Sequence, residues 1–242
     1  MPAPFATVWR TFERWALPTA CLGCDAPAPA DTLLCAPCRA LLRPAPTTPV
    51  PGLAALGGTV HAAFTYDAAC APLLTRYKFH DDLAAGRALA ALSLKALRSA
   101  PRPEALVPVP LHRRRLRQRG HDQALGLARD WGRALGLPVL FDALHRERDT
   151  RPQTELDARD RQRNLEAAFR VRAPLPAHVA LVDDVLTTGS TAAAAVHTLK
   201  AAGVARVDVW VVAQAPAPGK GALRAEMPRP TTGVDRNDGA AC

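Results

Sequence analysis

The chain has 242 residues, enough for one medium-sized domain and a small accessory unit. Hydrophobic residues make up 48% of it, which supports a sizeable core, but no apolar run is long enough to span a bilayer. The formal net charge is +9, and only four of the 31 basic residues are Lys. Because guanidinium groups bind phosphate oxygens in pairs, this excess of Arg favours phosphorylated ligands or nucleic acid. A GC-rich genome would produce the same excess, so composition alone does not identify the ligand.

Residues 1–17 are predicted to form an amphipathic helix. Its apolar residues recur at helical spacing: Phe5, Val8, Trp9 and Phe12. Such a face can lie on a membrane or a partner, although packing on the protein's own body is the more common arrangement. Arg10, Glu13 and Arg14 interrupt the apolar core that a signal peptide requires. We therefore expect a cytoplasmic protein without stable membrane insertion.

Two C-x-x-C pairs lie within residues 18–43 and are separated by ten residues. The four cysteines are Cys21, Cys24, Cys35 and Cys38. Each pair brings two thiolates to one side of a tight turn, and two such turns complete a tetrahedral site typical of structural zinc. A redox pair or disulfides are the rival interpretations, but a cytoplasmic chain keeps such thiols reduced. We predict a zinc ribbon whose four protein ligands leave no open position for chemistry.

Residues 44–58 contain four Pro and three Gly, and we interpret them as a linker. Residues 59–213 are predicted to form one α/β domain. Its expected elements are a strand at 60–66, a helix from 73 to a turn at 82, a helix at 83–98, a strand at 105–110, a helix from 121 to 135, a strand near 139–143, a strand from 179, a helix at 192–200 and a strand at 204–213. Strands alternating with helices predict a parallel sheet flanked by helices.

A basic cluster follows the strand at 105–110. It contains five Arg in seven positions: Arg113, Arg114, Arg115, Arg117 and Arg119. Open α/β sheets bind ligands at the carboxyl ends of their strands, where guanidinium groups can neutralise a pyrophosphate. A solvent-exposed face is the alternative for most of these side chains.

Residues 148–164 are almost wholly polar and show no apolar period. Arg151 and Gln153 lie in this segment and have side chains able to reach a phosphate. We predict a mobile lid over the site, with an ordinary exposed loop as the alternative. Residues 214–242 are rich in Pro and Gly, again without an apolar period, and are predicted to be a disordered tail.

The stretch from Ala180 to Thr191 carries the strongest functional signal. An apolar strand ends in Asp183 and Asp184, and a loop and helix follow: Thr187, Thr188, Gly189, Ser190 and Thr191. Backbone N–H groups, hydroxyls and a helix N-terminus meet there, which suits a phosphate. The two acids would repel that phosphate, so we expect them to face sugar hydroxyls or Mg²⁺, as in a site for a ribose 5-phosphate. An ordinary capped turn is the alternative, but capping requires neither two acids nor Thr-Thr-Gly in series.

These residues resemble the phosphoribosyl pyrophosphate (PRPP) signature of type I phosphoribosyltransferases. Together with further motifs, they make residues 18 to about 213 similar to the ComF family of competence proteins. The further motifs are the double C-x-x-C, Tyr77-Lys78-Phe79, residues 109–120, residues 150–153 and Arg163-Asn164. One departure is His121-Asp122-Gln123, where the family usually has Phe-Asn-Gln, because a carboxylate lacks the donor of an amide.

The resemblance implies a type I phosphoribosyltransferase fold with an N-terminal zinc ribbon, binding PRPP with Mg²⁺. Asp183 would bond the ribose 3-hydroxyl and Asp184 the 2-hydroxyl, as the catalytic acids, and residues 187–191 would hold the 5-phosphate. The implied pyrophosphate loop comprises Pro110, Leu111, His112 and Arg113. Candidates for lid or nucleic-acid contacts are Lys78, Arg114, Arg115, Arg117, Arg119, Arg151 and Gln153.

Two functions remain open from the sequence. ComF proteins are associated with uptake and handling of single-stranded DNA, which implies DNA and the competence helicase machinery as partners. The first function is therefore a PRPP-binding factor that handles DNA. The second is an active amidophosphoribosyltransferase-like enzyme that acts on an unidentified acceptor and has no role with DNA. Aromatic residues, the usual platforms for base stacking, make up only 5% of the chain, with Tyr77, Phe79 and the Trp residues as candidates.

Overall fold

The fold is seen in a computed structural model that describes residues 19–46, 49–79, 82–111, 116, 120–146 and 168–216. The predicted N-terminal helix, the segment at 148–164 and nearly all of the predicted tail lie outside these residues.

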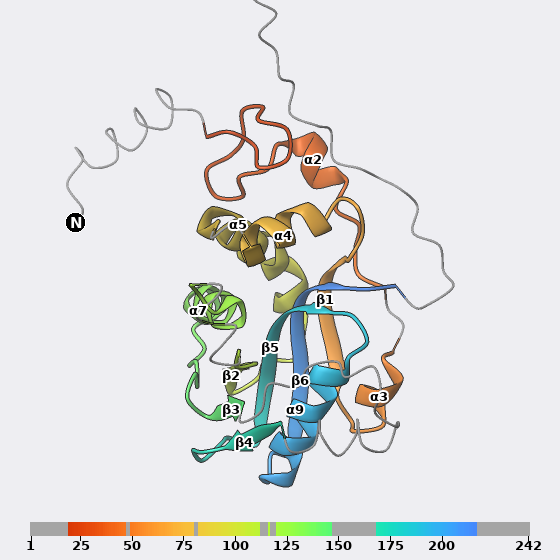
Figure 1. The fold of residues 1–242 in the computed structure, drawn as a ribbon, viewed down its shortest axis with the longest axis vertical. Helices are drawn as coiled ribbons and strands as arrows, with labels where there is room; N and C mark the ends of the chain where they lie inside the picture. The colour runs from red at the N-terminus through yellow and green to blue at the C-terminus, as the bar shows by residue number, and fades with distance from the viewer. Residues whose placement is uncertain are drawn as a thin grey trace, which may run out of the picture.

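A four-stranded parallel sheet forms the centre of the molecule (Figure 1). The strands are β1 (Thr59–Thr65), β2 (Ala105–Pro108), β5 (His178–Leu186) and β6 (Arg206–Gln214). They lie in the order β1-β6-β5-β2, so β5 and β6 are the interior strands. Both interior strands are nearly continuous apolar runs, as expected where a parallel sheet is covered on both faces.

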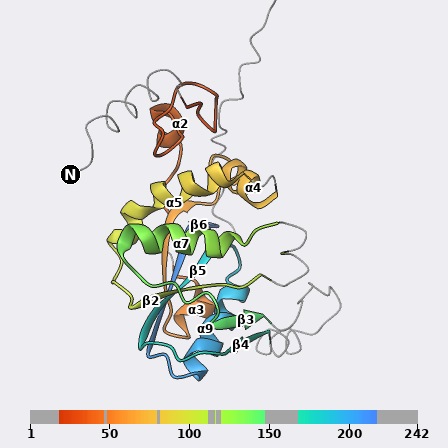
Figure 2. The same ribbon diagram turned by 90° about the vertical axis from the view of Figure 1, so that its left-hand side faces the viewer.

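Helices cover the two faces of this sheet, as Figure 2 shows. Helices α4 (Ala71–Phe79), α5 (Leu83–Arg98) and α7 (Gln123–Leu135) pack on one face. Helices α3 (Pro51–Ala54) and α9 (Ser190–Ala201) pack on the other. The predicted architecture of a parallel sheet between helices is confirmed.

Helix ends follow the capping residues in the sequence. Asp82 and Asp122 accept N–H bonds from Ala85 and Leu125 and so begin α5 and α7. Helix α7 ends at Gly136, whose left-handed conformation (φ 63°) terminates the helix at the predicted position.

The strand expected near residues 139–143 forms only a single bridge, in which Val139 lies beside Leu106. Leu106 donates to the Pro138 carbonyl and accepts from the Leu140 N–H. The next donor on β2 would be Pro108, which has no N–H, so the ladder stops there. The chain instead pairs β3 (Leu144–Arg146) with β4 (Phe169–Val171) as a short antiparallel hairpin that the sequence analysis did not anticipate.

The segment interpreted as a linker makes contacts with the domain. Pro44 bridges to Phe64 beside the edge strand β1, and α3 buries Leu53 completely against the sheet. Within the described part of the chain, no helix has both the length and the apolar character required to cross a membrane.

Candidate functional site

The candidate site lies at the carboxyl end of β5, where the loop to α9 begins (Figure 1). Strand β5 has β6 on one side and β2 on the other, so this loop emerges from the middle of the sheet edge. Parallel α/β sheets bind ligands at such an edge. The fold thus places residues 183–191 at the position where their chemistry can be used.

The loop leaves the first turn of α9 open to an incoming anion. Gly189 precedes the helix in a left-handed conformation (φ 77°), and no side chain caps the helix. A Cβ atom at this position would also lie 2.9 Å from Val50 Cγ1, so glycine is required by both conformation and space. Thr187, Thr188 and Ser190 are exposed around it. Uncapped N–H groups with exposed hydroxyls beside them form a phosphate-binding arrangement.

The Thr-Gly-Ser loop is held together by its own hydroxyls. The hydroxyl oxygens of Thr188 and Ser190 lie 2.9 Å apart, within hydrogen-bond distance. The loop is therefore ordered by local contacts.

The two acids point to opposite sides of the sheet. Asp183 pairs in register with Val211, which packs on the α9 side. Side chains alternate along a strand, so Asp184 turns towards the other side, where its carboxylate meets helix α4.

Asp184 forms an ion pair with Lys78. The Lys78 Nζ atom lies 3.0 Å from Asp184 Oδ1, and the two side chains are only 22% and 10% exposed. Lys78 comes from the last turn of α4. Sequence analysis treated it as a candidate for the lid or for nucleic acid, whereas the structure brings it to the acid pair.

Asp183 is held in an environment that disfavours its charge. Loss of surrounding water raises the pKa of Asp183 to about 7, and the nearby carboxylates of Asp184 and Asp122 act in the same direction. The Asp184 N–H, which donates to Asp183 Oδ1 at 2.8 Å, and the Lys78 ammonium only partly offset this rise. A ligand that contacts Asp183 therefore meets a carboxyl group that titrates near neutral pH.

Asp122 anchors the start of the proposed pyrophosphate loop. Its Oδ1 accepts from Leu125 N–H at 2.9 Å, and its Oδ2 accepts from Leu111 N–H at 3.3 Å. Both oxygens are thus used as acceptors, and the amide that the ComF family usually carries here has only one oxygen. Burial raises the pKa of Asp122. Asp122 was not among the predicted site residues, and the signal that could have found it is an Asp immediately before a helix.

The remaining predicted ligand contacts divide into two groups. Pro110 and Leu111 lie partly buried after β2. The other predicted contacts lie outside the described residues: His112, Arg113, Arg114, Arg115, Arg117, Arg119, Arg151 and Gln153.

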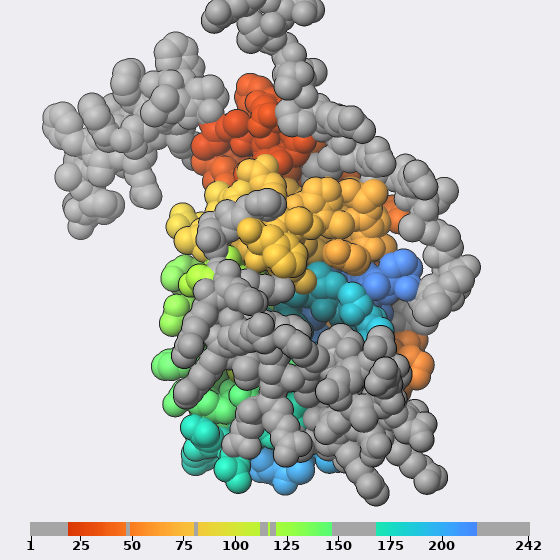
Figure 3. Space-filling view, in the orientation of Figure 1, coloured from red at the N-terminus to blue at the C-terminus, as the bar shows by residue number. Residues whose placement is uncertain are grey.

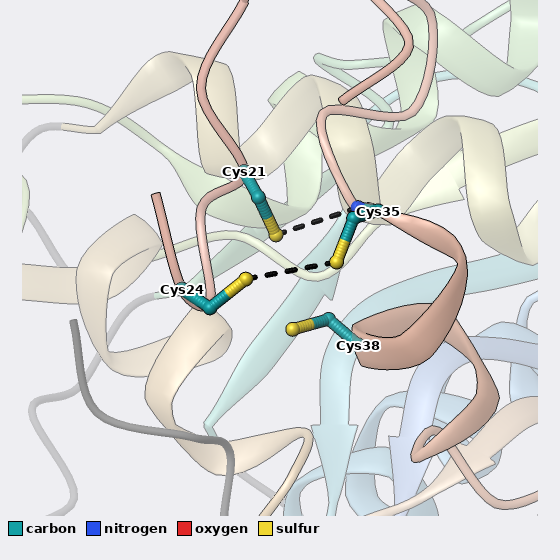
Figure 4. A group of neighbouring side chains, drawn as sticks. All are labelled: Cys21, Cys24, Cys35 and Cys38. Atoms are coloured by element: carbon teal, nitrogen blue, oxygen red, sulfur yellow. Dashed lines mark hydrogen bonds between the residues drawn. The ribbon is translucent and has the colours of Figure 1, made fainter. Parts of the chain in front are cut away.

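The four cysteines of the two C-x-x-C pairs converge on one point, as Figure 4 shows. Their sulfur atoms all lie within 4.8 Å of one another, and the Sγ atoms of Cys24 and Cys35 are 3.6 Å apart. Cys21 Sγ also accepts the N–H groups of Gly23 and Cys35, both at 3.4 Å. Burial and the neighbouring thiols raise the pKa of Cys38. A cation among the sulfurs would remove this penalty, so the group could hold a metal ion.

The cysteine module packs directly on α4 and α5 (Figure 3). Arg76 of α4 connects the two parts, because its Nη1 donates to the Leu22 carbonyl, inside the first C-x-x-C turn, at 2.8 Å. The same guanidinium contacts Asp82, the residue that caps α5, at 2.8 Å. Helix α4 is therefore fixed to the cysteine module two residues before Lys78. Sequence analysis did not assign a role to Arg76.

Comparison with known proteins gives relatives along most of the chain. Competence protein F of Haemophilus influenzae is 39% identical over 153 residues, which cover 59% of this chain and 67% of that protein. DNA utilization protein YhgH of Escherichia coli K12 is 35% identical over 199 residues, covering 79% and 82%. YhgH of Salmonella typhi is 41% identical over 111 residues, covering 46% and 49%. No family model matches the chain.

The raised pKa of Asp183 predicts that Asp183→Asn stabilises the protein at alkaline pH. The folded state binds a proton at Asp183 up to about pH 7, whereas an unfolded Asp releases it near pH 4. Between these values the folded state holds more protons, so this group lowers the free energy of unfolding as pH rises. We expect Asp183→Asn to raise Tm by a few degrees at pH 8 and by much less at pH 4.

Thermal melts at several pH values test this expectation. Asp31→Asn, at an exposed acid, is the matched control and should leave Tm unchanged at every pH. An equal gain from Asp183→Asn at pH 4 and pH 8 would contradict the explanation.

Proposed function

The chain belongs to the ComF family, and we propose that it binds PRPP with Mg²⁺ and handles single-stranded DNA during DNA uptake. The observation that carries the PRPP part is the juxtaposition at the end of β5. There an uncapped helix N-terminus and its exposed hydroxyls lie next to two carboxyl groups. Few ligands require a phosphate site and a hydroxyl-binding site side by side, and a ribose 5-phosphate is one of them.

In this proposal the 5-phosphate is held by residues 187–191 and the ribose hydroxyls by the acid pair. The proton near neutral pH on Asp183 is released when the carboxylate accepts hydroxyl bonds. Asp184 already has a cationic partner in Lys78, which keeps that carboxylate charged and oriented. Mg²⁺ would accompany the pyrophosphate, and residues 110–113 would face that part of the ligand.

The proposal concerns binding, and turnover would be a further property of the same site. If PRPP reacted here, Asp183 and Asp184 would lie beside the positive charge that develops on the ribose as pyrophosphate leaves. Release of pyrophosphate with and without added acceptors separates an active phosphoribosyltransferase from a PRPP-binding factor.

The cysteine module is proposed to hold structural zinc. Four thiolates at 2.3 Å from a tetrahedral ion are separated by about 3.8 Å, close to the 3.6 Å between Cys24 and Cys35. The N–H groups that point at Cys21 Sγ are the usual partners of a metal-bound thiolate. Zinc here would stabilise residues 18–43 and, through Arg76, the position of α4.

The DNA part of the proposal is supported by the names of the relatives and by charge. Two related proteins carry names that refer to competence and to DNA utilization. A net charge of +9 favours binding to a polyanion, and the Arg cluster at 113–119 is the proposed contact.

PRPP with Mg²⁺ is expected to stabilise the wild-type protein against heat. At a hundredfold excess over Kd, binding contributes about 2.7 kcal/mol, which corresponds to a rise in Tm of roughly 5–10 °C. Asp183→Asn combined with Asp184→Asn should abolish this rise, because both ribose contacts are lost. Asp31→Asn is the control and should keep it. Equal protection of the double variant, measured by differential scanning fluorimetry, would refute the proposed ribose site.

The purified protein is expected to contain about one zinc ion per chain. Cys38→Ser should lose most of that zinc and lower Tm, because too few apolar residues surround the ribbon to replace the metal. Cys70→Ala removes a buried cysteine outside the cluster and should retain the zinc. Elemental analysis gives the metal content directly. A wild-type protein that is folded throughout residues 18–43 without metal would contradict the assignment.

Single-stranded DNA is expected to bind through phosphate contacts from the Arg cluster. If about three Arg engage, affinity falls roughly as the second power of salt concentration, since each contact contributes a slope near −0.7. Changing Arg114, Arg115 and Arg117 to Ala should flatten this slope, whereas Arg133→Ala, at an exposed position on α7, should not. Salt titrations of a fluorescent oligonucleotide measure both. A slope that is unchanged in the triple variant would place the DNA contacts elsewhere.

A further inference from the structure

Among the aromatic side chains of the described residues, the large rings are mostly buried. Tyr77, Trp131, Trp210 and Phe169 are each no more than 6% exposed. Two phenylalanines differ, because Phe79 is 64% exposed and Phe141 is 62% exposed. An exposed ring contributes nothing to the core, so its position indicates whether it can serve a ligand.

Phe79 lies at the rim of the candidate site. It is the last residue of α4 and directly follows Lys78, whose ammonium is 3.0 Å from Asp184. Adjacent Cα atoms are about 3.8 Å apart, so the Phe79 ring begins one residue from the acid pair. Leu83, at the start of α5, is 52% exposed and extends the apolar surface across the turn between the two helices.

The end of α4 that carries Phe79 is rigidly held. The Tyr77 ring packs so closely on α5 and α7 that a Cβ atom at Gly86 or Gly126 would overlap it. Its hydroxyl donates to the Gln123 carbonyl at 2.9 Å, and the neighbouring Arg76 contacts Leu22 and Asp82. A ring displayed on a fixed backbone loses little conformational entropy when a ligand binds, which is the property of an effective stacking platform.

We propose that Phe79 stacks on a base of single-stranded DNA bound across this site. The inference rests on the proposed function, because it takes a nucleic acid as the ligand. Every base has a flat apolar face, so stacking on Phe79 adds affinity without adding sequence preference. Phosphates are bound elsewhere, by Arg side chains, because the acid pair beside Lys78 repels them. Phe79 thus contacts the base and makes no contact with the backbone charge.

The experiment compares two fluorescent oligonucleotides of equal length, one of thymidine and one in which the central nucleotides are abasic. Phe79→Ala should weaken binding of the thymidine strand by about five- to hundredfold, the range for loss of one stacked base. It should leave binding of the abasic strand unchanged and the salt slope of both strands unchanged, because no phosphate contact is lost. Phe79→Trp should restore the affinity for thymidine.

Two further variants separate stacking from a general apolar contact. Phe79→Leu keeps apolar area without a ring and should behave like Phe79→Ala. Phe141→Ala removes an equally exposed ring and should bind both strands as the wild type does. Full affinity of Phe79→Leu for thymidine, or an equal loss on both strands in Phe79→Ala, overturns the proposal.

The failure of this inference can be told apart from failure of the proposed function. If the wild type binds DNA and Phe79→Ala has no effect on the thymidine strand, stacking by Phe79 is wrong and the DNA role stands. If the wild type binds neither strand at low salt, both the DNA role and the stacking proposal are wrong. Thermal protection by PRPP, which carries no base, reports on the sugar-phosphate site in either case.

Discussion

The ion pair between Lys78 and Asp184 is the contact on which the rest of the site depends. Three carboxyl groups, those of Asp122, Asp183 and Asp184, influence one another at the same end of the sheet. The pair is largely buried, so removing Lys78 would leave a charged carboxylate with little water around it. One ammonium therefore allows three acids to crowd together, and α4 must be placed accurately to supply it.

That placement comes from both sides of α4. Tyr77 locks the helix against α5 and α7, and Arg76 ties it to the first cysteine turn. The cysteine module also shares a core with the domain, since Cys21, Cys35 and Cys38 belong to the same apolar cluster as Leu73 and Leu74. The module is thus part of the framework that orients Lys78. Loss of its metal would be felt at the ligand site through α4, even though no cysteine contacts the ligand.

How much the sequence predicts depends on how far apart the interacting residues lie in the chain. The acid pair, the Thr-Gly-Ser loop and helix α9 are contiguous, so their order alone indicated a phosphate site. The two C-x-x-C pairs are short local signals of the same kind. The Lys78–Asp184 pair and the Asp122–Leu111 bond join separate segments, and no local pattern specifies them. The bridge that stops at Pro108 was predictable, because the missing N–H is visible in the sequence, whereas the β3–β4 hairpin was not.

The alternation of side chains along β5 also constrains how a ligand can lie. Asp183 is on the α9 side of the sheet, and Asp184 is on the α4 side. A ribose that contacts both acids must therefore lie across the end of the strand. Its 5-phosphate then points to the uncapped start of α9, and the substituents on the opposite side of the sugar point towards Lys78 and Phe79. The phosphate and the aromatic surface are thus separated by the width of one sugar, which is the spacing of phosphate and base within a nucleotide.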